Sequence, residues 1–190
     1  MKPFAGYETT RPYSNIERLP AGGYVVKILD AEEVEYSWGR VLVISFDVSE
    51  GEQKGFFQQN YEDQQVEDRK WKGTYRMNVP KEDGSKEDEW TARRFRTDID
   101  AIQDSNPGYH WDWNEKDLKG KTVGALFRNK EYEYNGRRGF FTECCAFTDV
   151  GVIRSKKYKM PNDKMLKRPA EQTNTMDDFA PIDDDNLPFS

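Results

Sequence analysis

The chain has 190 residues, of which 35% are hydrophobic and 34% are charged, and its formal net charge is −6. This length suits one globular domain with a flanking tail. No apolar run approaches the roughly 18–20 residues that a membrane-spanning helix needs, and the first residues lack the apolar segment of a signal peptide, so we expect a cytoplasmic protein.

The N-terminal part predicts an irregular arm followed by a β-hairpin. Residues 1–20 contain three prolines among polar and aromatic residues and form the arm. Two glycines then precede a segment rich in β-forming residues, from Tyr24 to about Val34. After a turn at residues 37–40, every even position from 42 to 48 is apolar, which is typical of a strand with one buried face.

A third strand is predicted over residues 70–79, after a polar stretch at residues 49–69 to which we assign no element. Apolar and polar side chains alternate along it, so that Trp71 and Tyr75 share one face. The opposite face carries Lys70, Lys72 and Arg76. We expect the apolar face to pack inward and the basic face to be exposed.

A charged surface loop at residues 80–89 and a helix over about residues 91–104 follow. Phe95, Ile99 and Ile102 repeat at helical spacing and form one apolar stripe. An Asn-Pro-Gly sequence then ends the helix.

The strongest turn signal in the chain is Asn135-Gly136, a dipeptide typical of two-residue hairpin turns. It joins two predicted strands, Val123 to Tyr134 and Gly139 to Thr148. Residues 150–153 continue the last strand or begin another, and residues 154–170 form a basic linker.

The resulting order of three strands, one helix and two strands is the order of the OB-fold, a five-stranded Greek-key barrel that binds oligonucleotides. We therefore predict a mainly β OB-fold domain over residues 21–153, with one helix between the third and fourth strands. Residues 117–123 also resemble the Leu-x-Gly-Lys start of the fourth strand in several phage OB-fold proteins.

Residues 171–190 form a strongly acidic C-terminal tail, with six acidic and no basic side chains, which accounts for the whole net charge. Such a composition predicts disorder. The end of the tail resembles the C-terminal tip of bacterial single-stranded DNA-binding proteins (SSBs), in which an Asp run is followed by an apolar residue, Pro and Phe. In that family Phe is the last residue, whereas Ser190 follows it here. The matching residues are Asp183, Asp184, Asp185, Leu187, Pro188 and Phe189.

Taken together, the chain resembles a phage or prophage OB-fold SSB. The resemblance implies a sequence-tolerant protein that binds single-stranded DNA during replication and recombination in the bacterial host cytoplasm. It also implies that the acidic tail recruits replication and recombination proteins. The alternative for the tail is an ordinary solubilising segment, and the sequence leaves the oligomeric state open.

Basic and aromatic side chains interleave around the predicted Asn135-Gly136 turn. Single-stranded nucleic acid requires this combination, because cations follow its phosphates and aromatic rings stack on any base. Residues 121–170 contain 12 Lys and Arg against five Asp and Glu, which adds a basic footprint. The candidate binding residues are Trp38, Arg40, Lys70, Lys72, Arg76, Arg128, Lys130, Tyr132, Tyr134, Arg137, Arg138 and Phe140. The alternative is a solvated hairpin whose tyrosines cover the edge of the barrel.

The sequence offers little for catalysis, and we predict no cofactor, metal site or catalytic residue. Cys144 and Cys145 are adjacent, so a strand would direct them to opposite faces, with at least one buried. His110 is the single histidine, and no Cys/His metal spacing surrounds it. Two rival hypotheses are an OB-like adaptor that binds protein, and a metal-dependent nuclease. The carboxylates available to a nuclease are Asp47, Asp98, Asp100 and Glu143. RNA remains open as the ligand.

Overall fold

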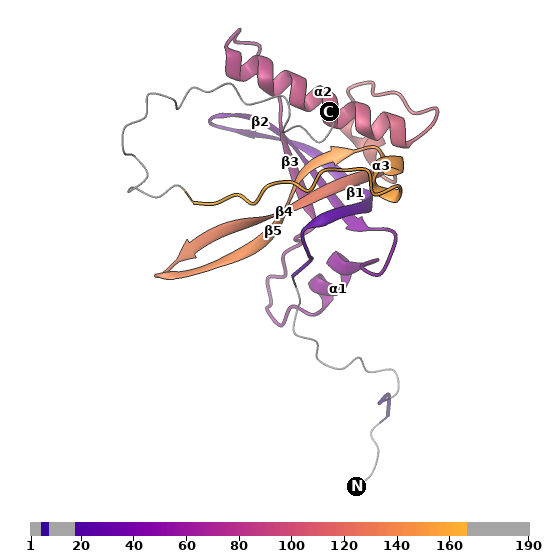
Figure 1. Ribbon diagram of the computed structural model, residues 1–190, viewed down its shortest axis with the longest axis vertical. Coiled ribbons are helices and arrows are strands. Elements are labelled where there is room, and N and C mark those ends of the chain that lie inside the picture. The colour runs from indigo at the N-terminus through magenta and orange to yellow at the C-terminus, as the bar shows by residue number, and fades with distance from the viewer. Residues whose placement is uncertain (1–4, 8–17, 167–190) are drawn as a thin grey trace.

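The computed structural model describes residues 5–7 and 18–166. These residues form a mainly β structure with one antiparallel five-stranded open sheet, in the order β3-β2-β1-β4-β5, and helices packed around it (Figure 1). The strands are β1 (Gly22–Tyr36), β2 (Gly39–Val48), β3 (Thr74–Asn78), β4 (Thr122–Tyr134) and β5 (Arg137–Thr148). The helices are α1 (Phe56–Glu62), α2 (Lys86–Ser105) and α3 (Val150–Arg154), with a 3₁₀ turn at Glu115–Leu118. No helix in this part of the chain has the length and apolar character that a membrane span requires.

Both predicted hairpins are confirmed. β1 and β2 pair up to Tyr36 opposite Gly39. β4 and β5 pair up to Tyr134 opposite Arg137, so the turn consists of Asn135 and Gly136 alone, with φ angles of 49° and 73°. Positive φ at both residues is the geometry that makes Asn-Gly the preferred two-residue turn. Pairing of β1 with β4 joins the two hairpins into one sheet.

The main core lies between one face of the sheet and α2, which crosses the top of the molecule in Figure 1. The apolar residues at even positions of β2 are all buried, as predicted. So is the α2 stripe of Phe95, Ile99 and Ile102. Aromatic rings dominate the centre, where Phe46 packs edge-on against Phe127 and Phe147 at centroid distances of 6.0 and 6.2 Å. This aromatic packing offsets the low aliphatic content of the chain.

A smaller cluster lies under α3, and it corrects the prediction that residues 150–153 are strand. Asp149 accepts a hydrogen bond from the Gly151 N–H at 2.7 Å, which begins a helix instead. Val150 and Ile153 then pack on Val25 and Leu126. A Cβ atom at Gly124 would lie 2.6 Å from the Ile153 side chain, so this glycine allows α3 to lie close against β4.

The third strand is shorter than predicted, because the ladder covers only Thr74–Asn78. The backbone of Lys70 instead exchanges two hydrogen bonds with the Gln64 side chain, both at 2.9 Å. The predicted inward and outward faces hold, since Tyr75 and Met77 are buried and Arg76 is exposed.

Two helices begin where the sequence analysis placed none. α1 was not predicted, because its first N–H groups are capped from a distance: Asp47 on β2 accepts from Phe57 at 2.9 Å and from Gln58 at 3.1 Å. α2 begins at Lys86, within the predicted charged loop. The Ser85 side chain caps it by accepting from the Asp88 N–H at 3.1 Å. Acidic residues in the first turn then favour the helix dipole.

The predicted basic linker is described up to residue 166, and part of it joins the sheet. Lys164 donates its N–H to the Asn129 carbonyl and accepts from the Glu131 N–H, both at 2.9 Å. It can do so because β1 ends its pairing with β4 at Phe127 and leaves the rest of that edge open. The N-terminal arm, residues 167–170 of the linker and the acidic tail lie outside the described residues, except for residues 5–7 and 18–20 of the arm.

Gly73 provides a stability test of the junction between β3 and α1. A Cβ atom there would lie 2.3 Å from the Phe46 carbonyl oxygen and 2.7 Å from the Phe57 ring. We expect Gly73→Ala to lower the free energy of unfolding by about 1–3 kcal/mol through overpacking, as measured by urea denaturation. Gly84→Ala is the control, because a Cβ atom there meets nothing within 4 Å and only its φ of 74° is strained. Because the positive φ alone costs an alanine at position 84 about 1–2 kcal/mol, the outcome that would contradict the packing argument is a Gly73→Ala protein as stable as the native one.

Candidate nucleic-acid interface

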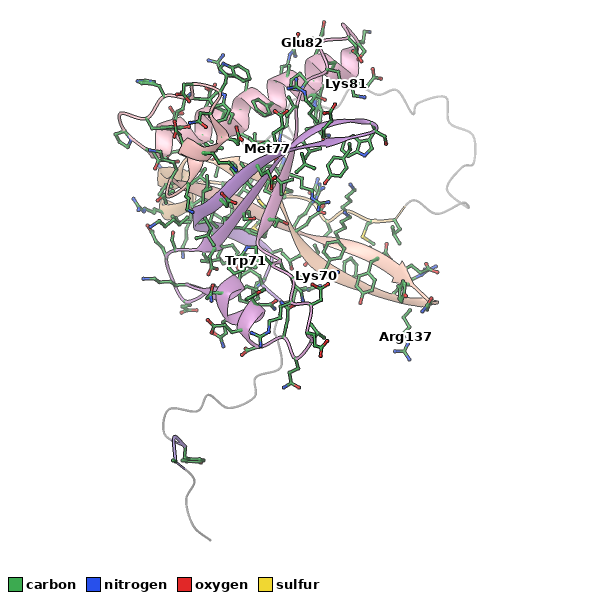
Figure 2. The ribbon with its side chains drawn as sticks, turned by 180° about the vertical axis from the view of Figure 1, so that it is seen from behind. Lys70, Trp71, Met77, Lys81, Glu82 and Arg137 are labelled. Atoms are coloured by element: carbon green, nitrogen blue, oxygen red, sulfur yellow. The ribbon has the colours of Figure 1, made fainter. Side chains whose placement is uncertain are left out.

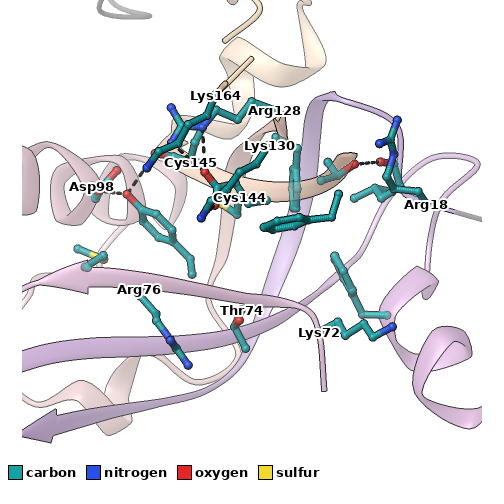
Figure 3. Close-up of a pocket in the computed structure, with 18 of the residues that line it drawn as sticks. Arg18, Lys72, Thr74, Arg76, Asp98, Arg128, Lys130, Cys144, Cys145 and Lys164 are labelled. Atoms are coloured by element: carbon teal, nitrogen blue, oxygen red, sulfur yellow. Dashed lines mark hydrogen bonds and ion pairs between the residues drawn. The ribbon is translucent and has the colours of Figure 1, made fainter. Parts of the chain in front are cut away.

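A cleft of about 1360 Å³ runs between β3 and the β4–β5 hairpin. Figure 3 shows Thr74 and Arg76 from β3, with Lys72 from the segment just before it, on one side, and Arg128 and Lys130 on the other. α2 contributes Trp90 and Arg94, and Arg18 borders the cleft beside the hairpin. The cleft is larger than the roughly 300–1,000 Å³ typical of small-ligand sites, and so has room for a polymer.

The lining of the cleft is strongly basic. Its seven cationic residues are Arg18, Lys72, Arg76, Arg94, Arg128, Lys130 and Lys164. Asp98 and Glu143 are the two acidic residues among its lining. Lys72 and Arg76 are exposed and make no ion pair within the described part of the chain, so their charges are available to an anionic ligand.

Glu143 organises the cations on the hairpin. Its carboxylate accepts from Arg128 at 2.8 Å and from Lys130 at 2.9 Å, and the Lys130 ammonium lies 5.3 Å from the centre of the Phe141 ring. Burial acts to raise the pKa of Glu143, but hydrogen bonds from Lys130 and Arg128 outweigh it and hold the pKa below its usual value. One carboxylate between two cations leaves this wall with a net positive charge.

Exposed aromatic rings lie beside these cations. Tyr132, Phe140 and Phe141 are each more than 40% exposed, and Trp90 is 52% exposed. The Tyr132 and Phe141 rings share one face of the hairpin, with centroids 6.2 Å apart. Tyr132 packs over Gly139, where a Cβ atom would lie 2.8 Å from its hydroxyl oxygen. Rings held in this way are preorganised for stacking on bases.

A buried polar network closes one part of the cleft and connects β3, α2 and β5 (Figure 3). Asp98 accepts from the Tyr75 hydroxyl at 2.8 Å, from Arg94 at 3.2 Å and from the Phe147 N–H at 2.9 Å. Arg94 also donates to the Cys145 carbonyl. Burial raises the pKa of Asp98, against the opposing effect of Arg94. Because no ladder joins β3 to β5, this network and the contact between the Tyr75 and Phe147 rings, with centroids 4.7 Å apart, connect the two strands beside the cleft.

The structure brings half of the twelve candidate binding residues to the cleft. These six are Lys72, Arg76, Arg128, Lys130, Tyr132 and Phe140. Trp38 and Arg40 lie instead at the β1–β2 turn, where Trp38 stacks on Tyr36 with centroids 5.2 Å apart. Lys70 pairs with Asp68 at 3.6 Å.

The other three candidates lie at the far end of the β4–β5 hairpin, beyond the cleft. Tyr134 and Arg137 are exposed there, and Arg138 pairs with Glu133 at 2.8 Å. Figure 2 shows Arg137 projecting from this tip.

Among the further residues that line the cleft, Arg18, Trp90, Arg94 and Phe141 were not predicted from the sequence, and Lys164 belongs to the predicted basic linker. Trp90 stands just before the predicted start of the helix. Recognising the Ser85 cap would have placed Trp90, Arg94 and Asp98 on one face, four residues apart. Phe141 lies opposite Lys130 in the hairpin, and the two-residue turn alone determines that pairing. Arg18 and Lys164 lie in segments without a periodic pattern.

The four carboxylates considered for a nuclease are held apart by structural roles. Asp47 caps α1, Asp98 joins the buried network, Asp100 pairs with Arg96, and Glu143 pairs with Arg128 and Lys130. Within the described residues, no group of three or more His, Cys, Asp or Glu side chains could hold a metal ion. Cys144 is buried and Cys145 partly buried, and both are free thiols.

The fold and the site define a mainly β protein with a basic cleft bordered by aromatic rings. No protein-family model matches the chain, and no curated protein matches it.

Proposed function

We propose that this chain is an OB-fold protein that binds single-stranded DNA in the cleft between β3 and the β4–β5 hairpin. The strand order, with the long helix α2 between β3 and β4, supports an OB barrel whose seam lies between β3 and β5. The observation that carries the proposal is that unpaired cations and exposed aromatic rings border one cleft. Phosphates would lie along the cations, and bases would stack on Trp90, Tyr132 and Phe141.

The combination of cations and exposed aromatic rings supports single-stranded DNA as the ligand in preference to a duplex. It also supports binding that does not depend on base sequence. Bases in a duplex already stack on one another, so their faces are not accessible to the rings of the cleft. Every base has a π-face, so stacking at about 1–3 kcal/mol per base does not select sequence. In this proposal the protein acts in phage DNA replication and recombination, and the acidic residues Asp183 to Phe189 recruit partner proteins.

The proposal is tested by titrating the protein into fluorescein-labelled dT30 and following anisotropy at several salt concentrations. We expect tight binding at low salt, with an affinity that falls as about the −3.5 power of salt if about five phosphates are neutralised. A 30-base-pair duplex should bind far more weakly, and rU30 measures the preference between DNA and RNA. Absence of dT30 binding at low salt would overturn the proposal and favour the adaptor. Loss of dT30 that requires Mg²⁺ would favour the nuclease.

Trp90 allows a fluorescence test that reports on the cleft itself. The chain has five tryptophans, and of these Trp90 lines the cleft while Trp38 and Trp113 lie elsewhere on the surface. We expect dT30 to quench tryptophan emission in the native protein, and Trp90→Phe to remove most of this quenching while affinity falls by less than about tenfold, since a phenyl ring still stacks. Trp38→Phe is the matched control. Unchanged quenching in Trp90→Phe would place the bases outside the cleft.

A further inference from the structure

A second pocket, of about 420 Å³, lies between the β1–β2 hairpin, the loop after β3, α2 and the 3₁₀ turn. Three aromatic rings line it, those of Phe95, Trp111 and Trp113, and so do three glutamates. The glutamates are Glu33, Glu82 and Glu115. Arg40 is the one cation in this lining, so this acidic aromatic pocket carries a net negative charge, opposite to that of the cleft.

The most exposed ring of the pocket, that of Trp113, is held in one orientation. Trp113 is 74% exposed, yet its ring stacks parallel to Phe95 with centroids 6.3 Å apart and an interplanar angle of 8°. Its backbone has φ of 70°, a left-handed conformation that is strained for a bulky residue. Strain of this kind persists where the surroundings maintain it, and it concentrates at binding sites. An exposed indole presented in this way offers its free face to a ligand.

The carboxylates identify the ligand as a cation. Glu33 pairs with Arg40 at 3.3 Å, whereas neither Glu82 nor Glu115 makes an ion pair within the described residues. A planar guanidinium suits such a pocket best, because it can pair with carboxylates through two hydrogen bonds and stack on an aromatic face at the same time. Trp111 lines the same pocket beside these carboxylates and adds to its aromatic surface.

The chain itself presents such a group. The Arg137 side chain is exposed at the end of the projecting β4–β5 hairpin and makes no hydrogen bond or ion pair within the described residues. Tyr134, opposite it across the turn, is 73% exposed and could extend the contact with Trp113. Figure 2 shows Arg137 and Glu82 at opposite ends of the molecule, so Arg137 cannot reach the pocket of its own chain.

We propose that the acidic aromatic pocket receives Arg137 and the hairpin tip of a second copy of this chain. The contact joins two different surfaces, so each copy keeps one free tip and one free pocket, and the assembly extends head to tail. Docking itself requires no DNA. The remaining consequence rests on the proposed function: docking would align successive copies, and so successive clefts, along one DNA strand. DNA binding would then be cooperative.

Charge reversal on each side of the contact tests this docking by sedimentation velocity without DNA, at low salt and increasing protein concentration. The native protein should show a sedimentation coefficient that rises with concentration. Glu115→Arg in the pocket and Arg137→Glu at the tip should each abolish the rise. The double variant, and an equimolar mixture of the two single variants, should restore it, which a misfolded protein could not do. Glu52→Arg, an exposed charge reversal outside the pocket, is the control.

Sedimentation that is independent of concentration in the native protein overturns the docking proposal. So does association that survives both single variants, that fails to return in the double variant, or that is equally lost in Glu52→Arg. A DNA measurement keeps this result separate from the proposed function. Glu115→Arg should bind an oligonucleotide long enough for one copy with native affinity and should lose cooperativity on long poly-dT. Loss of binding to the short oligonucleotide in Glu115→Arg would overturn the inference that the acidic aromatic pocket takes no part in binding DNA.

Discussion

Reversing the two unpaired charges in and just before β3, with Lys72→Glu and Arg76→Glu together, is expected to weaken the binding of dT30 by about 10²- to 10³-fold at low salt. Both residues line the cleft, and their side chains are exposed and lack an acidic partner among the described residues. Each would lose a charge-assisted contact with a phosphate and would then repel the same phosphate. The wall formed by Arg128 and Lys130 cannot compensate, because Glu143 already neutralises part of its charge.

The measurement is a salt titration of anisotropy for the native and double-variant proteins. Two fewer phosphate contacts should reduce the slope of log affinity against log salt by about 1.4. The control, Lys54→Glu with Lys119→Glu, changes the net charge equally at exposed sites outside the cleft. We expect only a small loss there, which salt screening removes. An equal loss in the two double variants would show that net charge, and not the cleft, governs binding.

The sequence predicted those parts of the structure that local chemistry determines. The Asn135-Gly136 turn fixed the register of the β4–β5 hairpin, and with it the shared face of Lys130 and Tyr132. Alternation in β2 and helical spacing in α2 identified the buried side chains correctly. The five strands and the helix between β3 and β4 were found for the same reason, since each has a clear period or a strong turn.

The errors in the predicted helices and in the bounds of β3 have two causes. Either a capping signal near in sequence was overlooked, or the residue that determines the structure lies in another segment of the chain. The Ser85 cap and the acidic turn after it were readable, and overlooking them removed Trp90 from the helix. The cap of α1 could not be read in the same way, because Asp47 reaches it from another strand. The extended prediction for β3 failed for a similar reason, since the Gln64 side chain takes the backbone groups of Lys70.

The candidate site needed information that no local pattern carries. Arg76 lies on β3 and Lys72 just before it, while Lys130 and Phe141 lie on the hairpin more than fifty positions later in the chain. They border one cleft only because the sheet brings its two outer strands, β3 and β5, toward each other. Interleaved basic and aromatic residues identified the composition of the site, but they also selected Arg137 and Arg138, which lie beyond the cleft.

The approach of β3 to β5 rests on the buried network around Asp98, and removing that carboxylate should have the largest effect on stability. We expect Asp98→Ala to lower the free energy of unfolding by about 3–5 kcal/mol, because it leaves the partly buried charge of Arg94 without its partner. The Tyr75 hydroxyl and the Phe147 N–H would also lose their acceptor. A domain of this size is stable by only about 5–15 kcal/mol, so urea denaturation at low temperature is the suitable measurement.

Helix α2 also supplies a matched control, a second ion pair with the same spacing of four residues. Arg96 and Asp100 form a shorter ion pair, 2.7 Å against 3.2 Å for Arg94 and Asp98. The Asp100 side chain is 40% exposed, however, and that of Asp98 only 2%. Exposed pairs at this spacing contribute about 0.3–0.5 kcal/mol, so Asp100→Ala should be nearly neutral. Burial, and not the length of the ion pair, therefore determines which substitution is costly.

Asp98→Asn and Tyr75→Phe separate the charge from the hydrogen bonds and keep the test usable if the alanine variant does not fold. Asp98→Asn retains an acceptor for the Phe147 N–H but removes the charge that faces Arg94, so it should lie between the native protein and Asp98→Ala. Tyr75→Phe leaves that charge in place and should cost about 1–3 kcal/mol. Hydrogen exchange at the Phe147 amide should quicken in Asp98→Ala, since that N–H donates to Asp98. A stability loss no greater than that of Asp100→Ala, with exchange at Phe147 unchanged, would mean that aromatic packing alone holds β3 near β5.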